Sequence, residues 1–494
     1  MTTTKDDLAH VKSIHLMGVA GTGMGAFAGL LKAAGYDVRG SDQNVYPPMS
    51  DRLEAWGIET RTPYGPDNLD PAPDLVVVGN VIRKVNDEAT AMRERGLLHR
   101  SFPETFGALF LDGRAPVVVA GTHGKTTTSS LLAHAFYAAG KDPGFLVGGI
   151  PTNTFDAGDD ADCGESFRVG AQTATTPVVV EGDEYDTAYF DKGPKFLHYR
   201  PKYLLCTSLE YDHADIYENV EAIEARFTQL FKLVPDDGVI VLRAGQPHLE
   251  KALADAGDDV TAAVVRYGSE GEDADAQHTI LDENANGIRV AYRHDDVAFE
   301  FDLPLYGHHN VDNATGAAAI MLRWGCTPDE VVASFASFKG VKRRMERKGQ
   351  VGKALVIDDF AHHPTAVDTT LKGAKAAFGE RPVWALFEPR SATSCRKVFQ
   401  DAYANAFGAA DRVLLAPPGR QLDPSEALDV PQLAADVTAQ GIQADDYENI
   451  ELMIDAVAQH APDDVVLLCM SNGAFGGIHQ KLLDALEARA GERS

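Results

Sequence analysis

The sequence predicts an α/β protein built from three units with parallel sheets. The chain has 494 residues, which is too many for one hydrophobic core, so about three domains are expected. Short apolar runs alternate with stretches of helical character along most of the chain, and two of these runs lead into glycine-rich loops. We expect the units to span residues 1–110, 111–338 and 339–494.

Composition and charge exclude several classes of protein. A hydrophobic content of 44% and a charged content of 24% are ordinary for a globular chain. No apolar run approaches a membrane span, and residues 1–10 lack the features of a secretory signal. The formal net charge of −28 argues against nucleic acid or a membrane surface as a partner. Local cations and backbone amides must therefore meet any anionic substrate.

Cysteine usage predicts a cytoplasmic protein. The 5 cysteines are widely spaced, odd in number and without a C-x-x-C pair. This pattern fits a reducing compartment and indicates neither a disulfide framework nor a zinc site.

The first unit carries a dinucleotide-type glycine loop. An apolar run at residues 13–18 precedes it, and a stretch of helical character follows. Gly21, Gly23 and Ala26 fit the pattern G-x-G-x-x-G/A, and Asp42 ends the next predicted strand. These features predict a Rossmann-like unit that holds a pyrophosphate at a helix N-terminus. NAD and a nucleotide-sugar both remain open as the ligand, and a plain glycine turn is the structural alternative.

The second unit opens with a phosphate-binding loop. A strand at residues 117–120 leads into Gly121-Thr-His-Gly-Lys-Thr-Thr127, and a helical stretch follows. Backbone N–H groups at a helix start attract an anion, Lys125 adds a point charge, and Thr126 can offer its hydroxyl to Mg²⁺. The loop is one residue shorter than the usual G-x-x-x-x-G-K-[ST] pattern.

Two later strands of this unit end in carboxylates, as a metal site next to a phosphate loop requires. The strand at residues 177–180 runs into a cluster of four acids, of which one or two are expected to face Mg²⁺ and the rest solvent. The strand that begins at residue 203 runs into His213, which has acids on both sides. The four acids of the first cluster are Glu181, Asp183, Glu184 and Asp186.

Beyond these acids, residues 288–303 alternate in polarity and predict a hairpin with one wet face. Asn310 and Asn313 lie one helical turn apart, so both could face a ligand, or Asn310 could cap the helix. Residues 339–348 form the densest basic run in the chain. We expect this run to bring positive charge onto bound phosphates and to allow domain closure.

The third unit repeats the α/β pattern, with strands predicted near residues 354–359, 383–387, 412–416 and 464–470. Ligands belong at the carboxyl ends of such strands. Two nucleotide-type loops in one chain suggest ATP together with a nucleotide-linked substrate.

The chain resembles the Mur ligases along nearly its whole length. Six motifs occur in the family's order: Gly121-Thr-His-Gly-Lys-Thr-Thr127, Glu181-Gly-Asp-Glu184, Asp212-His-Ala-Asp215, Gly307-His-His-Asn310, Arg343-Arg-Met-Glu346 and Asp358-Asp-Phe-Ala-His-His-Pro364. The resemblance implies an amide-forming ligase that uses ATP and Mg²⁺.

Within this family, two groups accept UDP-N-acetylmuramate. One group adds L-alanine, and the other adds the recycled tripeptide L-alanyl-γ-D-glutamyl-meso-diaminopimelate. The chain looks more similar to the second group, with L-alanine as the alternative amine. The stretches that favour the tripeptide are Asn44-Val-Tyr-Pro-Pro-Met-Ser50, Ser208-Leu-Glu-Tyr-Asp-His-Ala-Asp-Ile-Tyr217, Glu388-Pro-Arg-Ser391 and Met470-Ser-Asn-Gly-Ala-Phe-Gly-Gly-Ile-His-Gln-Lys481.

The resemblance also implies roles for individual residues. Lys125 would contact the β- and γ-phosphates, Asn310 the adenine and Arg344 the phosphoryl group in transfer. Thr126 and Glu181 would hold one Mg²⁺ and His213 a second, while Asp359 and His362 would close the site and orient the amine. The ATP site would comprise Gly121, Thr122, His123, Gly124, Lys125, Thr126, Thr127, Asn310 and Arg344. The UDP-sugar site would comprise Gly18, Gly21, Gly23, Ser41, Asp42 and Asn80, and the peptide site Phe360, His362 and Arg390.

Two other classes compete with a ligase. An NAD-dependent oxidoreductase would account for the first glycine loop but would leave the second loop unused. A phosphate-loop switch protein would need a guanine-reading Asn-Lys-x-Asp motif, which the sequence lacks. We expect a monomer or weak homodimer.

Overall fold

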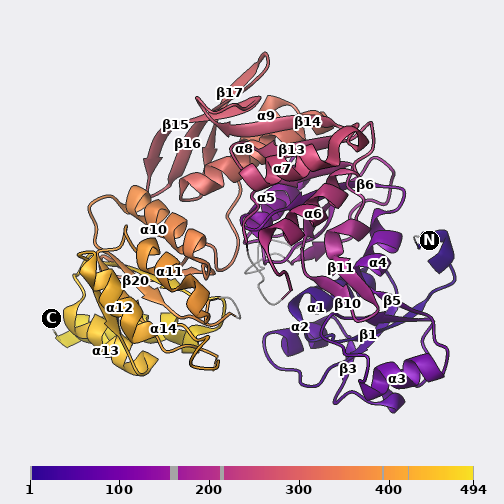
Figure 1. Ribbon diagram of the computed structural model, residues 1–494, viewed down its shortest axis with the longest axis horizontal. Helices are drawn as coiled ribbons and strands as arrows, with labels where there is room; N and C mark the ends of the chain where they lie inside the picture. The colour runs from indigo at the N-terminus through magenta and orange to yellow at the C-terminus, as the bar shows by residue number, and fades with distance from the viewer. Residues whose placement is uncertain (1–2, 156–164, 212–215, 392–393, 421, 493–494) are drawn as a thin grey trace.

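Three sheets, built one after another along the chain, form the framework of the molecule (Figure 1). The computed structural model describes residues 3–155, 165–211, 216–391, 394–420 and 422–492. Each sheet is mainly parallel and has helices between its strands, so the predicted three-part α/β architecture is confirmed. The unit borders at residues 110 and 338 stay predictions.

The first sheet is fully parallel, with strand order β3-β2-β1-β4-β5. The chain moves outward from β1 to β3 and then returns to place β4 on the other side of β1. Ligands of α/β proteins bind at such a switch point. The strands are β1 (Ser13–Met17), β2 (Asp37–Ser41), β3 (Glu59–Arg61), β4 (Leu75–Val78) and β5 (His99–Ser101), and the helices are α1 (Thr22–Ala33), α2 (Met49–Ala55), α3 (Asp87–Glu94) and α4 (Phe102–Phe106).

The second sheet has ten strands in the order β17-β16-β15-β14-β13-β12-β6-β9-β7-β8. Its parallel centre surrounds β6, the strand before the phosphate loop, while β15, β16 and β17 form an antiparallel extension. The strands are β6 (Ala115–Ala120), β7 (Gly144–Leu146), β8 (Phe167–Arg168), β9 (Pro177–Gly182), β12 (Tyr203–Cys206), β13 (Val239–Arg243), β14 (Ala263–Ser269), β15 (Ala276–Asn284), β16 (Gly287–His294) and β17 (Val297–Leu303).

Five helices accompany this sheet, and a small hairpin follows β9. The helices are α5 (Lys125–Ala138), α6 (Val220–Phe231), α7 (Pro247–Ala256), α8 (His308–Trp324) and α9 (Pro328–Ala336), and the hairpin strands are β10 (Asp186–Ala188) and β11 (Asp191–Pro194). The predicted hairpin at residues 288–303 is confirmed, with Ile288, Val290 and Tyr292 buried on one face of β16.

The third sheet has the order β18-β19-β23-β20-β21-β22, and β18 is its one antiparallel strand among the described residues. The strands are β18 (Glu346–Val351), β19 (Ala354–Asp359), β20 (Val383–Phe387), β21 (Arg412–Leu415), β22 (Gln443–Asp446) and β23 (Val466–Met470). The helices are α10 (Pro364–Phe378), α11 (Gln400–Ala406), α12 (Val430–Ala439), α13 (Ile450–His460) and α14 (Ile478–Glu492).

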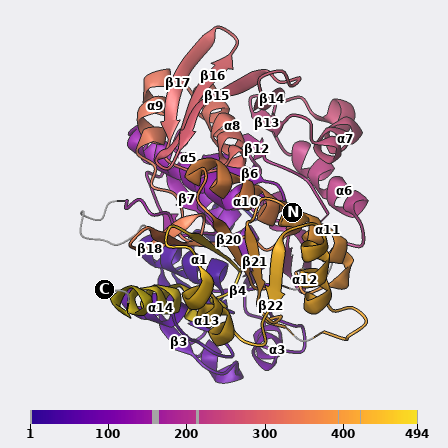
Figure 2. The ribbon, with the colours of Figure 1, turned by 90° about the vertical axis from the view of Figure 1, so that its left-hand side faces the viewer.

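The three units meet in two different ways. One continuous apolar core joins the first two units, since Phe27 and Phe106 share it with Val118 and Phe196. The third unit has cores of its own and approaches the second through α10, which lies against α8 and β15 (Figures 1 and 2). Among the described helices, none combines the length and apolar character needed to cross a bilayer.

Candidate active site

The phosphate loop is a tight turn between β6 and α5, and two of its glycines are required by its geometry. Gly121 has φ +137°, and a Cβ there would lie 2.3 Å from Thr207 Oγ1. Gly124 has φ +80°, and its Cβ would lie 2.7 Å from Asn313 Oδ1. A side chain at Gly121 would therefore collide with the segment after β12, and one at Gly124 would collide with α8.

Lys125 begins α5 and turns back over the loop. Its ammonium group donates to the carbonyl oxygens of Gly121 and Thr122 and forms an ion pair with Glu184 at 2.9 Å. Burial lowers the pKa of Lys125, but the carboxylates led by Glu184 outweigh burial and raise it above its usual value. The loop thus holds the protonated amine of Lys125, which can give up its ion pair with Glu184 and bind another anion in its place.

Thr126 and Glu181 come together beside the loop. The Thr126 hydroxyl donates to Glu181 Oε1 at 3.0 Å, and the Gly148 N–H donates to Glu181 Oε2 at 2.8 Å. Burial raises the pKa of Glu181, with Lys125 opposing it. A hydroxyl and a carboxylate beside a phosphate site are hard oxygen donors, the kind Mg²⁺ prefers, so these two residues fit a magnesium ion.

The neighbouring acids face other partners. Asp183 pairs with Lys195 at 2.6 Å, and Asp186 pairs with Lys192 at 2.8 Å. Although burial raises the pKa of Asp183, Lys195 and then Lys125 lower it below its usual value. Of the four candidate acids, Glu181 is therefore the one placed to share a cation with Thr126. The other predicted metal ligand, His213, lies outside the described residues.

Asn310 lies in the first turn of α8, but it is not the cap of that helix. The N-cap is Gly307, while Asn310 Nδ2 donates to the carbonyl oxygen of Tyr306 at 2.8 Å. Asn313 donates to Asn310 Oδ1 at 3.2 Å and also lies beneath Gly124. The two asparagines therefore connect the start of α8 to the underside of the phosphate loop.

Arg344 lies in the basic run between the second and third units. Its guanidinium carbon is 5.0 Å from the centre of the Phe360 ring, as is that of Arg343. The charge of Arg344 reaches the second unit, since burial and then Arg344 lower the pKa of His309 to about 4. Arg343 instead donates to the carbonyl oxygens of Ser471 and Gly473, both at 2.6 Å, and so fastens the run to the third sheet.

Asp359 is the last residue of β19 and His362 follows the strand, and their side chains make local contacts. Asp359 accepts hydrogen bonds from the backbone N–H groups of Met345 and Ala361, each at 2.8 Å. Burial raises the pKa of Asp359, with Arg344 opposing it. His362 Nδ1 lies 3.0 Å from the carbonyl oxygen of Phe360. In this structure Asp359 positions the basic run that carries Arg344.

Arg390 lies at the carboxyl edge of the third sheet, after β20. It contacts Glu388 at 3.3 Å, and its side chain passes between two glycines. A Cβ at Gly473 would lie 2.0 Å from Arg390 Cδ, and one at Gly419 would lie 2.8 Å from Arg390 Cγ. An exposed guanidinium held in such a slot suits bidentate binding of a carboxylate.

The first glycine loop lies at the switch point of the first sheet. Gly18 has φ +89°, and among the described residues no atom lies within 4 Å of a Cβ built at Gly23. Asp42 Oδ2 accepts from the Ala20 N–H at 2.9 Å and closes the loop, while Asn80 is exposed after β4. This arrangement leaves backbone N–H groups and open space for a pyrophosphate.

Ser41 supports this loop from below. It is fully buried and donates its hydroxyl to Glu88 Oε1 at 2.6 Å, and His15 Nε2 lies 2.7 Å from the same oxygen. The side chain of Ser41 is thus not available to a ligand in this structure. Sequence reasoning missed Glu88 because it lies in α3, 47 residues from Ser41, and no local motif connects the two.

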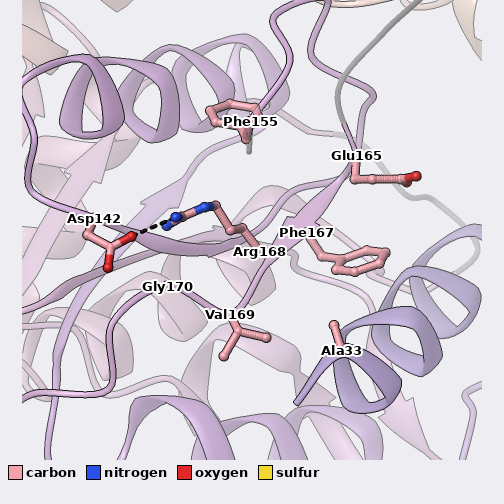
Figure 3. A pocket seen from close by; sticks show the side chains of 8 residues that line it. All are labelled: Ala33, Asp142, Phe155, Glu165, Phe167, Arg168, Val169 and Gly170. Carbon is pink, nitrogen blue, oxygen red and sulfur yellow. Dashed lines mark ion pairs between the residues drawn. The ribbon is translucent and has the colours of Figure 1, made fainter. Parts of the chain in front are cut away.

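A cavity of about 380 Å³ lies away from these residues, between the end of α1 and the segment around β8 (Figure 3). Its wall includes Phe155, Phe167 and the ion pair of Arg168 with Asp142, whose atoms are 2.6 Å apart. None of the predicted site residues lines this cavity, so it is not the candidate active site.

Comparison with known proteins accounts for all three units. Residues 13–114 match the Mur ligase family catalytic domain, 119–321 the Mur ligase middle domain, and 343–472 the Mur ligase glutamate ligase domain. Both glycine loops fall inside these matches, so the alternative of an NAD-dependent oxidoreductase is wrong.

Individual relatives agree with this assignment. The chain is 36% identical over 480 residues to the UDP-N-acetylmuramate–L-alanyl-γ-D-glutamyl-meso-2,6-diaminoheptandioate ligase of Escherichia coli K12, covering 97% of this chain and 99% of the relative. It is 37% identical to the UDP-N-acetylmuramate–L-alanine ligase of Kineococcus radiotolerans, covering 83% and 82%.

The crystal structure of a murein peptide ligase from Psychrobacter arcticus 273-4 superposes with a TM-score of 0.69 at 36% identity, covering 96% of this chain and 98% of that one. Three domain matches in sequence order and near-complete coverage of both partners lead to one conclusion: the chain belongs to the Mur ligase family.

Proposed function

We propose that this protein joins the tripeptide L-alanyl-γ-D-glutamyl-meso-diaminopimelate to UDP-N-acetylmuramate at the expense of ATP, and so returns a recycled peptide to cell-wall synthesis. The observation that carries the proposal is the group formed by Lys125, Thr126 and Glu181 at the phosphate loop. The tripeptide is favoured over L-alanine because tripeptide-ligase relatives that cover 97% of this chain are 35–36% identical to it, whereas an L-alanine ligase that covers 98% is 32% identical.

In the first step, an oxygen of the lactyl carboxylate attacks the γ-phosphorus of ATP, ADP leaves, and an acyl phosphate forms. Lys125 exchanges Glu184 for the β- and γ-phosphates, and the backbone N–H groups of the loop hold their oxygens. Arg344 neutralises charge on the phosphoryl group in transfer. Mg²⁺ bound by Thr126 and Glu181 would supply further charge neutralisation on the phosphates.

In the second step, the peptide amine attacks the acyl carbon, a tetrahedral intermediate forms, and phosphate leaves as the amide is made. The amine must lose a proton, while the developing oxyanion needs nearby positive charge. Arg390 holds a carboxylate of the peptide at the edge of the third sheet, and Phe360 and His362 flank the approach from β19. Most of the rate enhancement comes from positioning three substrates.

The assignment divides the chain by substrate. Residues 1–110 take the UDP part of UDP-N-acetylmuramate through the loop around Gly21 and Gly23 and through Asp42. Residues 111–338 take ATP, with Asn310 near the adenine, and residues 339–494 take the peptide. We infer a monomer or weak homodimer in the cytoplasm, where ATP is available.

The decisive experiment supplies the two amines in separate reactions. Phosphate release should require ATP, UDP-N-acetylmuramate and an amine together, and it should be faster with the tripeptide than with L-alanine at equal concentration. Faster turnover with L-alanine would change the substrate assignment to that of the Kineococcus-type relatives. No phosphate with either amine would remove the ligase proposal.

A substitution separates the two nucleotide loops. Lys125→Ala should lower turnover by about 10³-fold, because a charge that acts on the phosphoryl group in transfer is lost. UDP-N-acetylmuramate binding, measured by calorimetry, should be unchanged. Lys141→Ala is the matched control, since Lys141 follows the same helix and pairs with Glu330 away from the loop. Loss of UDP-N-acetylmuramate binding in Lys125→Ala would mean that the two loops were assigned in the wrong order.

A further inference from the structure

Three side chains from separate segments meet where the third unit touches the phosphate loop. His123 lies within the loop, Glu210 follows β12, and His363 immediately precedes α10. One nitrogen or oxygen atom from each lies within 4.8 Å of the corresponding atoms of the other two. None of the three residues belongs to the Thr126 and Glu181 pair described above.

The spacing of these atoms suits a shared metal ion better than a hydrogen bond. His123 Nε2 is 3.4 Å from Glu210 Oε2. Ligands about 2.0–2.1 Å from a tetrahedral ion are roughly 3.3–3.4 Å from each other. Within the part of the chain that the structure describes, the buried Nε2 of His123 makes no hydrogen bond. The centroids of the His123 and His363 imidazole rings are 5.0 Å apart, so the two rings are direct neighbours.

The carboxylate is held in position and ionised. The Thr365 hydroxyl donates to Glu210 Oε2 at 2.9 Å, and the Glu210 N–H donates to Thr122 Oγ1 at 2.8 Å. The imidazole of His123, against an opposing effect of burial, lowers the pKa of Glu210 below its usual value. Hydrogen bonds that orient a ligating carboxylate in this way are typical of metal sites.

The donor set also selects the kind of ion. Two imidazole nitrogens and one carboxylate oxygen suit Zn²⁺, Co²⁺ or Ni²⁺, whereas Mg²⁺ prefers oxygen ligands and octahedral geometry. We propose that His123, Glu210 and His363 bind a divalent transition-metal ion that fastens the phosphate loop to the third unit. Because two ligands come from the second unit and one from the third, the bound ion holds these units docked.

The expected effect of this ion on turnover rests on the proposed ligase reaction. His123 belongs to the loop that receives ATP, and the ion would restrain both the loop and the docking of the third unit. One equivalent of Zn²⁺ in the presence of excess Mg²⁺ should therefore slow phosphate release, and a chelator should reverse the effect. The His363→Gln enzyme should be insensitive to that Zn²⁺.

The test is Co²⁺ binding to the full-length protein in excess Mg²⁺, followed by visible absorption. One equivalent should bind with a d–d spectrum of low coordination number, and Zn²⁺ should displace it. His363→Gln and Glu210→Gln should each weaken binding at least tenfold, and Thr365→Val by a smaller factor. Glu181→Gln, which removes the proposed magnesium ligand, should retain the Co²⁺ spectrum. Circular dichroism of each variant checks that it is folded, and His123→Gln replaces any variant that is not.

Two outcomes would overturn the proposal: a wild-type protein that binds no Co²⁺ under these conditions, or a Co²⁺ site that survives both His363→Gln and Glu210→Gln. A site lost in Glu181→Gln alone would assign the ion to the magnesium position instead. Since the readout is metal binding, failure of the ligase proposal would leave this test unaffected.

Discussion

The junction between the first and second units is apolar, whereas the junction between the second and third is mainly polar. At the first, Phe106 of α4 is fully buried and meets Tyr199 of the second unit with ring centres 5.7 Å apart. At the second, Thr365 bonds Glu210, and Arg347 donates to Tyr306 Oη at 2.6 Å. Backbones also touch there, because a Cβ at Gly373 would lie 2.8 Å from Gly307 Cα.

This difference indicates which parts of the molecule move together. Opening the first junction would expose apolar side chains to water, so the first two units should behave as one body. The polar contacts of the second junction can be exchanged for water at lower cost. Arg343 and Met345, at φ +62° and +50°, lie in the connecting run, where backbone strain concentrates at the turn into β18.

Phe106→Ala should have the largest effect on stability. Truncating a fully buried phenylalanine should lower the free energy of unfolding by about 3–5 kcal/mol, and in denaturant the first two units should still unfold in one transition. Phe190→Ala is the control, because Phe190 is 41% exposed, and it should cost about 0.5 kcal/mol or less. Separate transitions for the first and second units in the wild type would contradict a shared core.

Acid should destabilise the second unit before it disrupts the polar junction. Burial lowers the pKa of His134 in α5 to about 4. The unfolded chain, with an ordinary histidine pKa of about 6.5, binds more protons between these values, so stability rises with pH across this window and is lost as pH falls. The loss from His134 is about 3 kcal/mol.

Burial also lowers the pKa values of His278 and His309 to about 4, so His134→Gln should remove about a third of the loss that these three histidines cause between pH 6.5 and 4. Urea unfolding at several pH values measures this slope, and exposed His460 provides the control through His460→Gln. An equal slope in wild type and His134→Gln would mean that His134 is not buried in its neutral form.

Features formed by neighbouring residues could be predicted from the sequence alone. A strand, a glycine loop and a helix start are adjacent in the chain, so both loops and Lys125 could be identified from neighbouring residues. Neighbouring residues did not single out Glu181 among the four acids; the family resemblance did, and the structure adds the reason that Lys195 and Lys192 pair with Asp183 and Asp186. Those pairs are set by the fold of the hairpin β10–β11 and the residues on either side of it, which no spacing rule predicts.

Contacts between distant segments could not be predicted from the sequence. Glu88 holds Ser41 from a helix 47 residues away, and His363 reaches His123 from another unit. Their residue types are common at surfaces and in cores, so neither carries a pattern by itself. The motif Asp358-Asp-Phe-Ala-His-His-Pro364 marked the region of His363 but indicated a role for His362 instead.

Gly373→Ala should separate stability from turnover at the polar junction. Alanine is the better helix former by about 1 kcal/mol, so the third unit should gain stability. The new Cβ would press on Gly307 and shift the third unit, and a displacement of this kind should lower turnover by roughly 10–100-fold. Gly491→Ala in α14, where no described atom lies within 4 Å of the new Cβ, is the control. Unchanged turnover would mean that catalysis uses a different docking of the third unit.

Thr365→Val should have the smallest effect and measures what one polar contact contributes at this junction. Valine keeps the shape of threonine but removes the hydroxyl that donates to Glu210 Oε2 at 2.9 Å. Glu210 remains partly exposed and can bond water instead, so the free energy of unfolding should fall by about 1 kcal/mol or less. Thr369→Val is the matched control, because Thr369 lies one turn further along α10 and donates to the helix's own carbonyl oxygens. A loss comparable to that of Phe106→Ala would mean that the second junction is as fixed as the first, and the two-body description of the enzyme would then be wrong.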